Sequence, residues 1–104
     1  MIEYLEHNFM GTISLEDMAK QAGVSKFHFV RMFKASTGLT PMAYLERMRL
    51  RESEALLRRR ELSLSQVARA SGFTSRRYFS RRFTRALGHS PSEYARNYVR
   101  NGEF

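Results

Sequence analysis

Apolar residues recur three or four positions apart in short runs along most of the chain, which is the spacing of one buried face of an α-helix. Runs that begin at Ile2, Leu15 and Leu64 all show this spacing. Glycine, or a serine or threonine followed by proline, interrupts the runs and marks where helices end and begin. The pattern predicts an all-α fold of about seven helices.

Two stretches of this pattern are copies of one another. The segment "SLEDMAKQAGVS" (14–25) aligns without a gap with "SLSQVARASGFT" (63–74), and past the second glycine the second copy gains one residue. Identical residues at matching positions include Ser14 and Ser63, Gly23 and Gly72, Phe29 and Phe79, Phe33 and Phe83, Gly38 and Gly88, and Tyr44 and Tyr94. Two copies are too few for a solenoid, so we interpret the chain as a duplicated unit.

Each copy is expected to fold as a helix, a tight turn and a second helix. A residue that can cap a helix stands before each predicted helix of the repeat, at Ser14, Ser25, Thr40, Ser63, Thr74 and Ser90. An acid or amide three residues after Ser14, Ser63 and Ser90 completes a capping box. Gly23 and Gly72 fall where the chain must turn, a position that favours a left-handed backbone. Two helix-turn-helix units in register are a specific signal, whereas one alone is common among helical hairpins.

The second helix of the second copy is unusually basic. The segment "GFTSRRYFSRRFTRALG" (72–88) holds five arginines and no acidic residue. On a helix over 75–87, the predicted core stripe consists of Phe79, Phe83, Ala86 and Leu87, and the opposite face consists of Arg77, Arg81 and Arg85. Like charges four positions apart destabilise an isolated helix by about 0.2–0.5 kcal/mol per pair. A polyanionic partner explains this face better than folding does.

The distribution of charge along the chain supports a nucleic acid as that partner. The 104 residues carry a net charge of +8, and the sequence pI is about 10.6. Residues 1–45 hold four basic and four acidic residues, whereas residues 46–104 hold 14 arginines and six glutamates. The guanidinium group suits bidentate contacts with phosphate and with guanine edges. Two recognition helices on one chain fit the major groove of B-DNA better than the narrow major groove of RNA.

Other function classes find little support in the sequence. The absence of cysteine excludes disulfides, a thiolate nucleophile and cysteine-based zinc sites, and it fits a reducing cytoplasm. The three histidines are isolated and no glycine-rich phosphate loop occurs, so we expect no metal, no cofactor and no enzymatic activity. No apolar run approaches the roughly 20 residues that cross a bilayer, and no secretory pattern opens the chain.

The matching helix of the first copy, "SKFHFVRMFKAST" (25–37), keeps the phenylalanines Phe29 and Phe33 but has a different outer face. Phe27 and Val30 are predicted to be exposed apolar side chains on this helix. They contact thymine methyl groups in a major groove, or they pack against a neighbouring helix in this domain or in an absent partner. The sequence leaves both interpretations open. If both helices contact DNA, their different faces predict an asymmetric site.

A longer helix is predicted to connect the two copies. The segment "PMAYLERMRLRESEALLR" (41–58) has no glycine and no internal proline, and its 18 residues would span about 27 Å. Neighbouring major-groove faces of B-DNA lie about 34 Å apart, so this helix could hold two recognition helices near successive grooves of a bent duplex. We expect a single DNA-binding domain over 1–104, with a first subdomain over 1–40, a linking helix over 41–60 and a second subdomain over 61–104.

The two units, the linking helix, and the segments "SKFHFVRMFKASTG" and "GFTSRRYFSRRFTRALGHSPSEYAR" together resemble the DNA-binding domain of AraC/XylS-type transcriptional regulators. The resemblance covers about residues 1–98. It implies a bacterial, cytoplasmic regulator that binds a promoter sequence in double-stranded DNA, usually an activator that contacts RNA polymerase. It also implies that the domain often belongs to a longer protein with an effector-binding or dimerisation domain. The sequence leaves open whether this chain is such a fragment.

In this family the second helix of each unit contacts the DNA. Carried over by position, the residues expected to read bases are Lys26, Phe27, Val30, Arg31, Arg76, Arg77, Ser80 and Arg81. The candidates for contacts with the DNA backbone are Ser25, Lys34, Thr40, Ser75, Arg82, Arg85 and Ser90. The alternative to DNA binding is a basic helical module that binds an acidic protein, and this alternative predicts no preference for duplex DNA.

Overall fold

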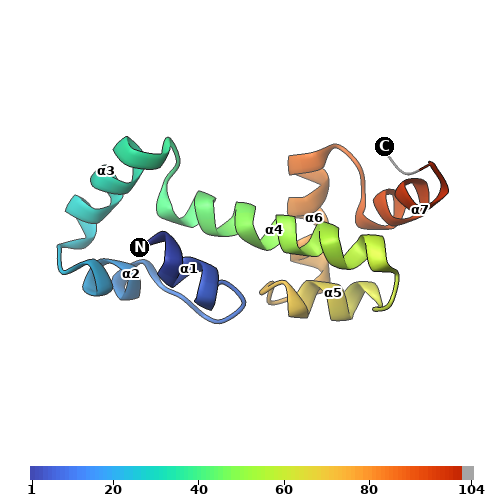
Figure 1. The fold of residues 1–104 in the computed structure, drawn as a ribbon, viewed down its shortest axis with the longest axis horizontal. Coiled ribbons are helices and arrows are strands. Elements are labelled where there is room, and N and C mark those ends of the chain that lie inside the picture. Colours follow the sequence, from blue (N-terminus) through green and yellow to red (C-terminus); the bar gives the residue numbers. More distant parts are fainter. Residues whose placement is uncertain (102–104) are drawn as a thin grey trace. The chain divides into compact units, whose positions relative to one another are not determined.

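The computed structural model describes the backbone of residues 1–101 and the side chains of residues 1–97, and this part of the chain forms seven α-helices and no strand (Figure 1). In chain order the helices are α1 (Ile2–Asn8), α2 (Leu15–Ala22), α3 (Lys26–Thr37), α4 (Pro41–Arg59), α5 (Leu64–Ala70), α6 (Arg76–Leu87) and α7 (Pro91–Asn101). The predicted all-α fold is confirmed. None of these helices combines the length and the apolar character needed to cross a membrane.

The chain divides into two compact units, Met1–Met48 and Arg49–Phe104, and the boundary falls within α4. Each unit has its own apolar core. The core of the first unit consists of Leu5, Ile13, Met18, Ala19, Phe29, Phe33 and Leu45. The core of the second unit consists of Leu50, Leu57, Val67, Ala68, Phe73, Phe79, Phe83 and Tyr94. In the first unit α2 packs on α3, and in the second both α5 and α7 pack on α6.

The predicted capping boxes are present at the first helix of each helix-turn-helix. Ser14 Oγ accepts a hydrogen bond from the backbone N–H of Asp17 at 3.0 Å, and the Asp17 carboxylate accepts one from the N–H of Ser14 at 3.2 Å. Ser63 and Gln66 repeat the arrangement at the start of α5. Gly23 then ends α2 with a φ of 74°, a left-handed conformation that side-chain-bearing residues rarely adopt. These local contacts determine where α2 and α5 begin and where α2 ends.

The prediction that Thr74 caps the second helix of the second unit is wrong. The cap is Ser75, whose Oγ accepts a hydrogen bond from the backbone N–H of Tyr78 at 3.1 Å. The two turns begin alike, because the N–H of Val24 and that of Phe73 each donate to the carbonyl oxygen of the alanine five positions earlier. Thr74 is the additional residue of the second copy and lies between this turn and the cap. It moves the start of α6 by one position relative to the turn glycine.

Three aromatic rings in each unit hold α3 against α4 and α6 against α7. In the first unit the ring centroids of Phe29 and Phe33 are 5.7 Å apart, and Phe33 meets Tyr44 of α4 edge-on at 5.4 Å. The second unit repeats these contacts at 5.6 Å and 5.5 Å with Phe79, Phe83 and Tyr94. Edge-to-face pairs of this kind stabilise a core beyond their buried area. They fix the rotation of α3 and α6 about their own axes.

Three apolar positions differ in burial from the predicted core. Ala86, expected in the core stripe of α6, is exposed, and Leu87 is only partly buried. A single exposed methyl group is ordinary on a protein surface, so helical spacing alone does not decide its burial. Leu50 of α4 is buried in the second core, and the hydroxyl of Ser53, three residues further along the helix, donates a hydrogen bond to the Leu50 carbonyl at 2.6 Å. The sequence pattern did not predict the burial of Leu50 or of Ser53.

Replacing Ser75 by alanine is expected to lower the free energy of unfolding by about 1 kcal/mol, because the N–H of Tyr78 loses its partner at the start of α6. Thr74→Ala is the matched control, since Thr74 is exposed and lies outside the helix, and it should change the free energy by less than about 0.5 kcal/mol. Urea unfolding followed by circular dichroism measures both variants. A larger loss for Thr74→Ala would contradict the assignment of the cap to Ser75.

Candidate nucleic-acid interface

Each unit carries its own candidate interface, which is the outward face of α3 in the first unit and the outward face of α6 in the second. In each helix two buried phenylalanines occupy the inner side, so the intervening positions point outward. The predicted base-reading residues that are exposed are Lys26, Phe27, Arg31, Arg76, Arg77 and Arg81. Val30 and Ser80 are partly buried. Each helix thus carries four of the eight predicted residues, at equivalent positions.

The outward face of α6 is strongly cationic. Arg76, Arg77, Arg81 and Arg85 are exposed. Within the part of the chain that the structure describes, neither Arg76 nor Arg77 has an ion-pair partner. The Arg81 guanidinium lies 6.0 Å from the ring centroid of Tyr78, at the outer limit of a cation–π contact. The arginines at the start of α6 therefore present their donors to solvent and to any anionic ligand.

A cavity of about 400 Å³ lies beside this face and adds a residue that sequence reasoning missed. Its lining consists of Tyr78, Arg81, Arg82 and Arg85. Tyr78 is 42% exposed. The sequence pattern did not single out Tyr78, because it lies on the side of the helix between the core stripe and the opposite arginine face. Guanidinium groups and a phenol around one hollow can donate hydrogen bonds to phosphate oxygens, so Tyr78 joins Arg82 and Arg85 as a candidate for backbone contacts.

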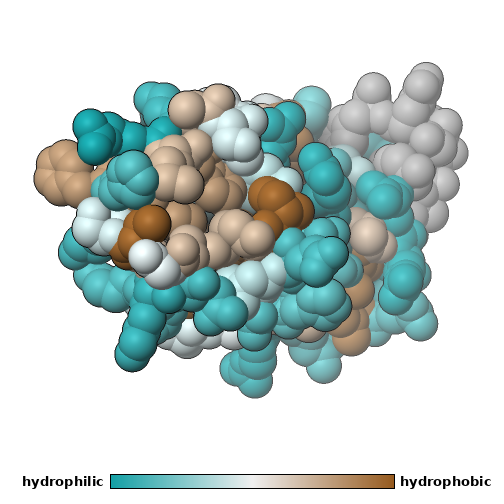
Figure 2. Space-filling model, turned by 60° about the vertical axis from the view of Figure 1, so that its left-hand side comes forward, coloured by the Kyte–Doolittle hydropathy of each residue, from teal (hydrophilic) through white to brown (hydrophobic). Residues whose placement is uncertain are grey.

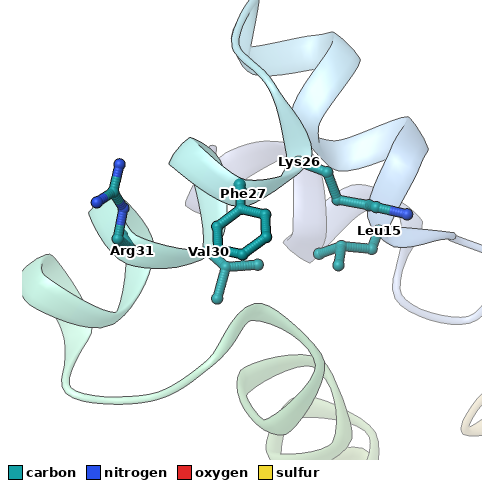
Figure 3. A pocket seen from close by; sticks show the side chains of 5 residues that line it. All are labelled: Leu15, Lys26, Phe27, Val30 and Arg31. Atoms are coloured by element: carbon teal, nitrogen blue, oxygen red, sulfur yellow. The ribbon is translucent and has the colours of Figure 1, made fainter.

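The start of α3 presents apolar side chains in place of arginine. Figure 3 shows Phe27 and Val30 pointing to the same side of α3, beside Leu15 from the start of α2. Together with Lys26 and Arg31 these residues line a cavity of about 300 Å³. Phe27 is 82% exposed, so it is not packed within its own unit. Leu15 was predicted only as a core residue; it packs on the core and also lines this cavity.

The first unit also exposes large apolar side chains that do not line this cavity. Figure 2 shows apolar side chains among hydrophilic ones on the face that this unit presents. The large apolar residues exposed in the first unit include Met1, Met10, Phe27, Met32 and Met42. Phe27 exceeds the others in exposure and lies next to cationic side chains on α3. An apolar ring beside a guanidinium and an ammonium group suits the mixed surface of a major groove.

Lys26 is held by an acidic residue of the preceding helix. Its Nζ donates a hydrogen bond to Glu16 Oε1 of α2 at 2.7 Å, and the two side chains are 54% and 67% exposed. This hydrogen bond is the main cause that lowers the pKa of Glu16 below its usual value, so the carboxylate is ionised at neutral pH. The pair ties the start of α3 to the first turn of α2. The sequence pattern did not predict it.

The predicted backbone contacts lie at helix N-termini and on the sides of α3 and α6. Four hydroxyls each accept a hydrogen bond from the backbone N–H three residues further on, and these belong to Ser25, Thr40, Ser75 and Ser90. The start of a helix favours a bound phosphate. At α7, however, the N–H of Ser90 already binds the Glu93 carboxylate at 3.0 Å and lowers the pKa of that group. Lys34 is exposed on α3.

The histidines take part in local structure or lie at the surface. The His7 ring nitrogen Nδ1 is 2.8 Å from the Glu3 carbonyl oxygen within α1, and His28 and His89 are exposed. Among the described residues, no group of three histidine, aspartate or glutamate side chains is arranged to hold a metal ion.

Comparison with known sequences relates the chain to regulatory proteins. A family described as a helix-turn-helix domain matches residues 18–97. The chain is 37% identical over 100 residues to the MmsAB operon regulatory protein of Pseudomonas aeruginosa, a match that covers 96% of this chain and 32% of that protein. It is 38% identical over 93 residues to the HTH-type transcriptional activator RhaS of Escherichia fergusonii, covering 89% of this chain and 34% of RhaS. The chain thus spans about a third of the length of these relatives.

A solved structure matches the fold over nearly the whole chain. The DNA-binding domain of the global transcriptional factor AdpA, in complex with a target DNA, superposes with a TM-score of 0.87. The two sequences are 32% identical, and the match covers 96% of this chain and 90% of that domain. The similarity therefore includes both helix-turn-helix units.

Replacing Phe27 by alanine should change the free energy of unfolding by less than about 0.5 kcal/mol, because its ring is 82% exposed. Phe29→Ala, two positions away on the same helix, should cost about 3–5 kcal/mol, because that ring is only 3% exposed. Thermal and urea unfolding of the two variants measure the contrast. A large loss for Phe27→Ala would mean that this ring stabilises the fold and is not free to contact a ligand.

Proposed function

The chain belongs to the AraC/XylS-type family of helix-turn-helix DNA-binding regulators, and on this basis we propose that it binds a specific promoter sequence in double-stranded DNA with α3 and α6. The observation that carries the proposal is the pair of equivalent helices, each fixed by two buried phenylalanines and each presenting side chains that suit a major groove. The net charge of +8 supplies the attraction to a polyanion.

The arginines of α6 divide by position into two roles. Arg77 and Arg81 lie on the side of the helix opposite the buried phenylalanines, where a recognition helix faces the floor of the groove. There a guanidinium group can bind guanine O6 and N7 in a bidentate manner. Arg82 and Arg85 line the flanking cavity with Tyr78 and are suited to phosphate oxygens along the groove edge. In this proposal Arg76 and Ser80 complete the base-reading set.

The apolar start of α3 reads different bases. The exposed Phe27 and the partly buried Val30 offer an apolar surface beside Arg31, and the methyl group of thymine is the apolar feature of the major groove. We therefore assign to the first unit a half-site that contains thymine, with Arg31 and Lys26 directed at neighbouring base edges. The second unit, with its arginines, takes a half-site rich in guanine contacts. The preferred site is consequently asymmetric.

The two helices are proposed to enter successive major grooves on one side of the duplex. Helix α4 joins the two units without interruption and is about 28 Å long, from 19 residues at 1.5 Å each. The groove spacing of B-DNA is about 34 Å, so binding of both helices is expected to bend the DNA at a cost on the order of 1–6 kcal/mol. A monomer can in this way make a contact with two half-sites.

Regulation by this domain is proposed to be activation through contact with RNA polymerase at bacterial promoters in the cytoplasm. The similarity to RhaS, which is described as a transcriptional activator, supports this direction. The MmsAB and RhaS relatives are about three times as long as this chain. An effector-binding or dimerisation domain, on the same polypeptide or on another, therefore belongs to the proposal.

Selection from random-sequence duplex DNA at physiological salt tests the proposed function. We expect an asymmetric consensus with two blocks about one helical turn apart, thymine-containing in the block read by α3, and binding at least about 1000-fold tighter than to a scrambled duplex. Enrichment of a single block would contradict binding in two successive grooves. The absence of enrichment, with weak binding that depends steeply on salt, would favour the alternative of a basic module for an acidic protein.

Arg77→Ala is expected to weaken binding to the selected site by about 1–3 kcal/mol and to relax the choice at one base position, because a bidentate contact with guanine is lost. Arg69→Ala is the matched control, since it removes the same charge from an exposed position on α5 of the same unit. Fluorescence anisotropy with the four single-base variants of the site measures both effects. Equal losses on every sequence would make Arg77 a phosphate contact.

A further inference from the structure

The two units differ in how the first cationic residue of the recognition helix is held. In the first unit the Lys26 ammonium group is bound to Glu16, with Nζ and Oε1 2.7 Å apart. In the aligned second unit Ser65 stands where the first unit has Glu16, and Arg76 stands where it has Lys26. Arg76 is exposed and has no ion-pair partner within the described residues. One recognition helix therefore begins with a paired cation and the other with an unpaired one.

The pair also determines where the ammonium group lies. In Figure 3 the Lys26 side chain runs from α3 towards Leu15 and α2, whereas Arg31 extends in the other direction. Lys26 lines the same cavity as Phe27 and Val30. The amine is thus held beside the apolar surface that the first unit presents, and one of its three N–H donors is bound by Glu16.

Stability of the fold does not account for this pair. Both side chains are more than half exposed, and ion pairs of that kind contribute little to the free energy of unfolding. The pair does change what the helix can bind. A lysine without a partner is a flexible point charge that any phosphate can attract, and a carboxylate beside it repels phosphate while leaving two N–H donors for acceptors such as guanine O6 and N7.

We propose that Glu16 determines the sequence specificity of the first unit by positioning Lys26. It keeps the ammonium group from binding phosphates non-specifically and directs it to a base edge next to Phe27 and Val30. Glu16 acts through Lys26 and does not itself contact a base. This inference rests on the proposed function, since it assigns a role within the same DNA-binding surface.

The test compares Glu16→Gln, Lys26→Gln and the double variant with the unmodified chain. Binding is measured by fluorescence anisotropy at several salt concentrations, on the selected duplex and on a scrambled duplex of equal length. Glu3→Gln is the matched control, because it removes the same charge from the first turn of α1 in the same unit and leaves the Glu16–Lys26 pair intact. Circular dichroism spectra of each variant check that its helices are retained.

For Glu16→Gln we expect binding to the scrambled duplex to tighten by up to about fivefold, the range that loss of an exposed ion pair allows. The slope of log K against log salt should steepen by about 0.9, because the released ammonium group now neutralises one phosphate. The ratio of specific to non-specific affinity should fall. In the Lys26→Gln background, Glu16→Gln should have no more effect than Glu3→Gln, and Lys26→Gln alone should lower the ratio without steepening the slope.

Three outcomes would overturn this inference while leaving the proposed function untouched, and a fourth would overturn both. If Glu16→Gln and Glu3→Gln change binding equally, only the net charge matters. If the effect of Glu16→Gln persists without Lys26, the carboxylate acts on the DNA directly. If the unmodified chain prefers the selected duplex but Glu16→Gln leaves the affinity ratio and the salt slope unchanged, the role of Glu16 fails while the proposed function stands. A chain that shows no preference for any duplex would overturn both.

Discussion

The burial of two phenylalanines one turn apart, on α3 and again on α6, is the constraint on which the rest of the molecule depends. Each pair packs into its core and against a tyrosine of the following helix, with ring centroids 5.4–5.7 Å apart. Because an α-helix advances about 100° per residue, burying these two positions directs the residues between and before them outward. The core therefore decides which side chains of α3 and α6 can meet a ligand.

On this common scaffold the two units present different chemistry at equivalent positions. Phe27 and Val30 of the first unit correspond to Arg77 and Ser80 of the second, and the paired Lys26 corresponds to the unpaired Arg76. The excess of positive charge lies wholly in residues 46–104. In the proposed complex the second unit provides most of the electrostatic attraction, and the first adds apolar and oriented polar contacts. In that complex the division of roles would let a duplicated fold read an asymmetric sequence.

Helix α4 contributes side chains to the cores of both units. Leu45 belongs to the first core, and Leu50 and Leu57 belong to the second. Near its C-terminal end, Arg58 Nη1 donates a hydrogen bond to the Tyr94 hydroxyl at 3.0 Å, while burial raises the pKa of that phenol. The same tyrosine packs on Phe83. The helix that links the units thus also helps to position α6 through α7.

The seven helices, the duplication and the two helices that carry the candidate site could be predicted from the sequence, because caps, turn glycines and apolar spacing are local signals. Contacts between helices were decided only in the tertiary structure. Helical spacing could not tell whether Ala86 would be covered, and the alignment, in which the second copy gains one residue after Gly72, could not tell whether Thr74 or Ser75 caps α6. The Glu16–Lys26 pair joins residues ten positions apart on two helices, so it depends on how α2 packs against α3. A local pattern carries no information about that packing.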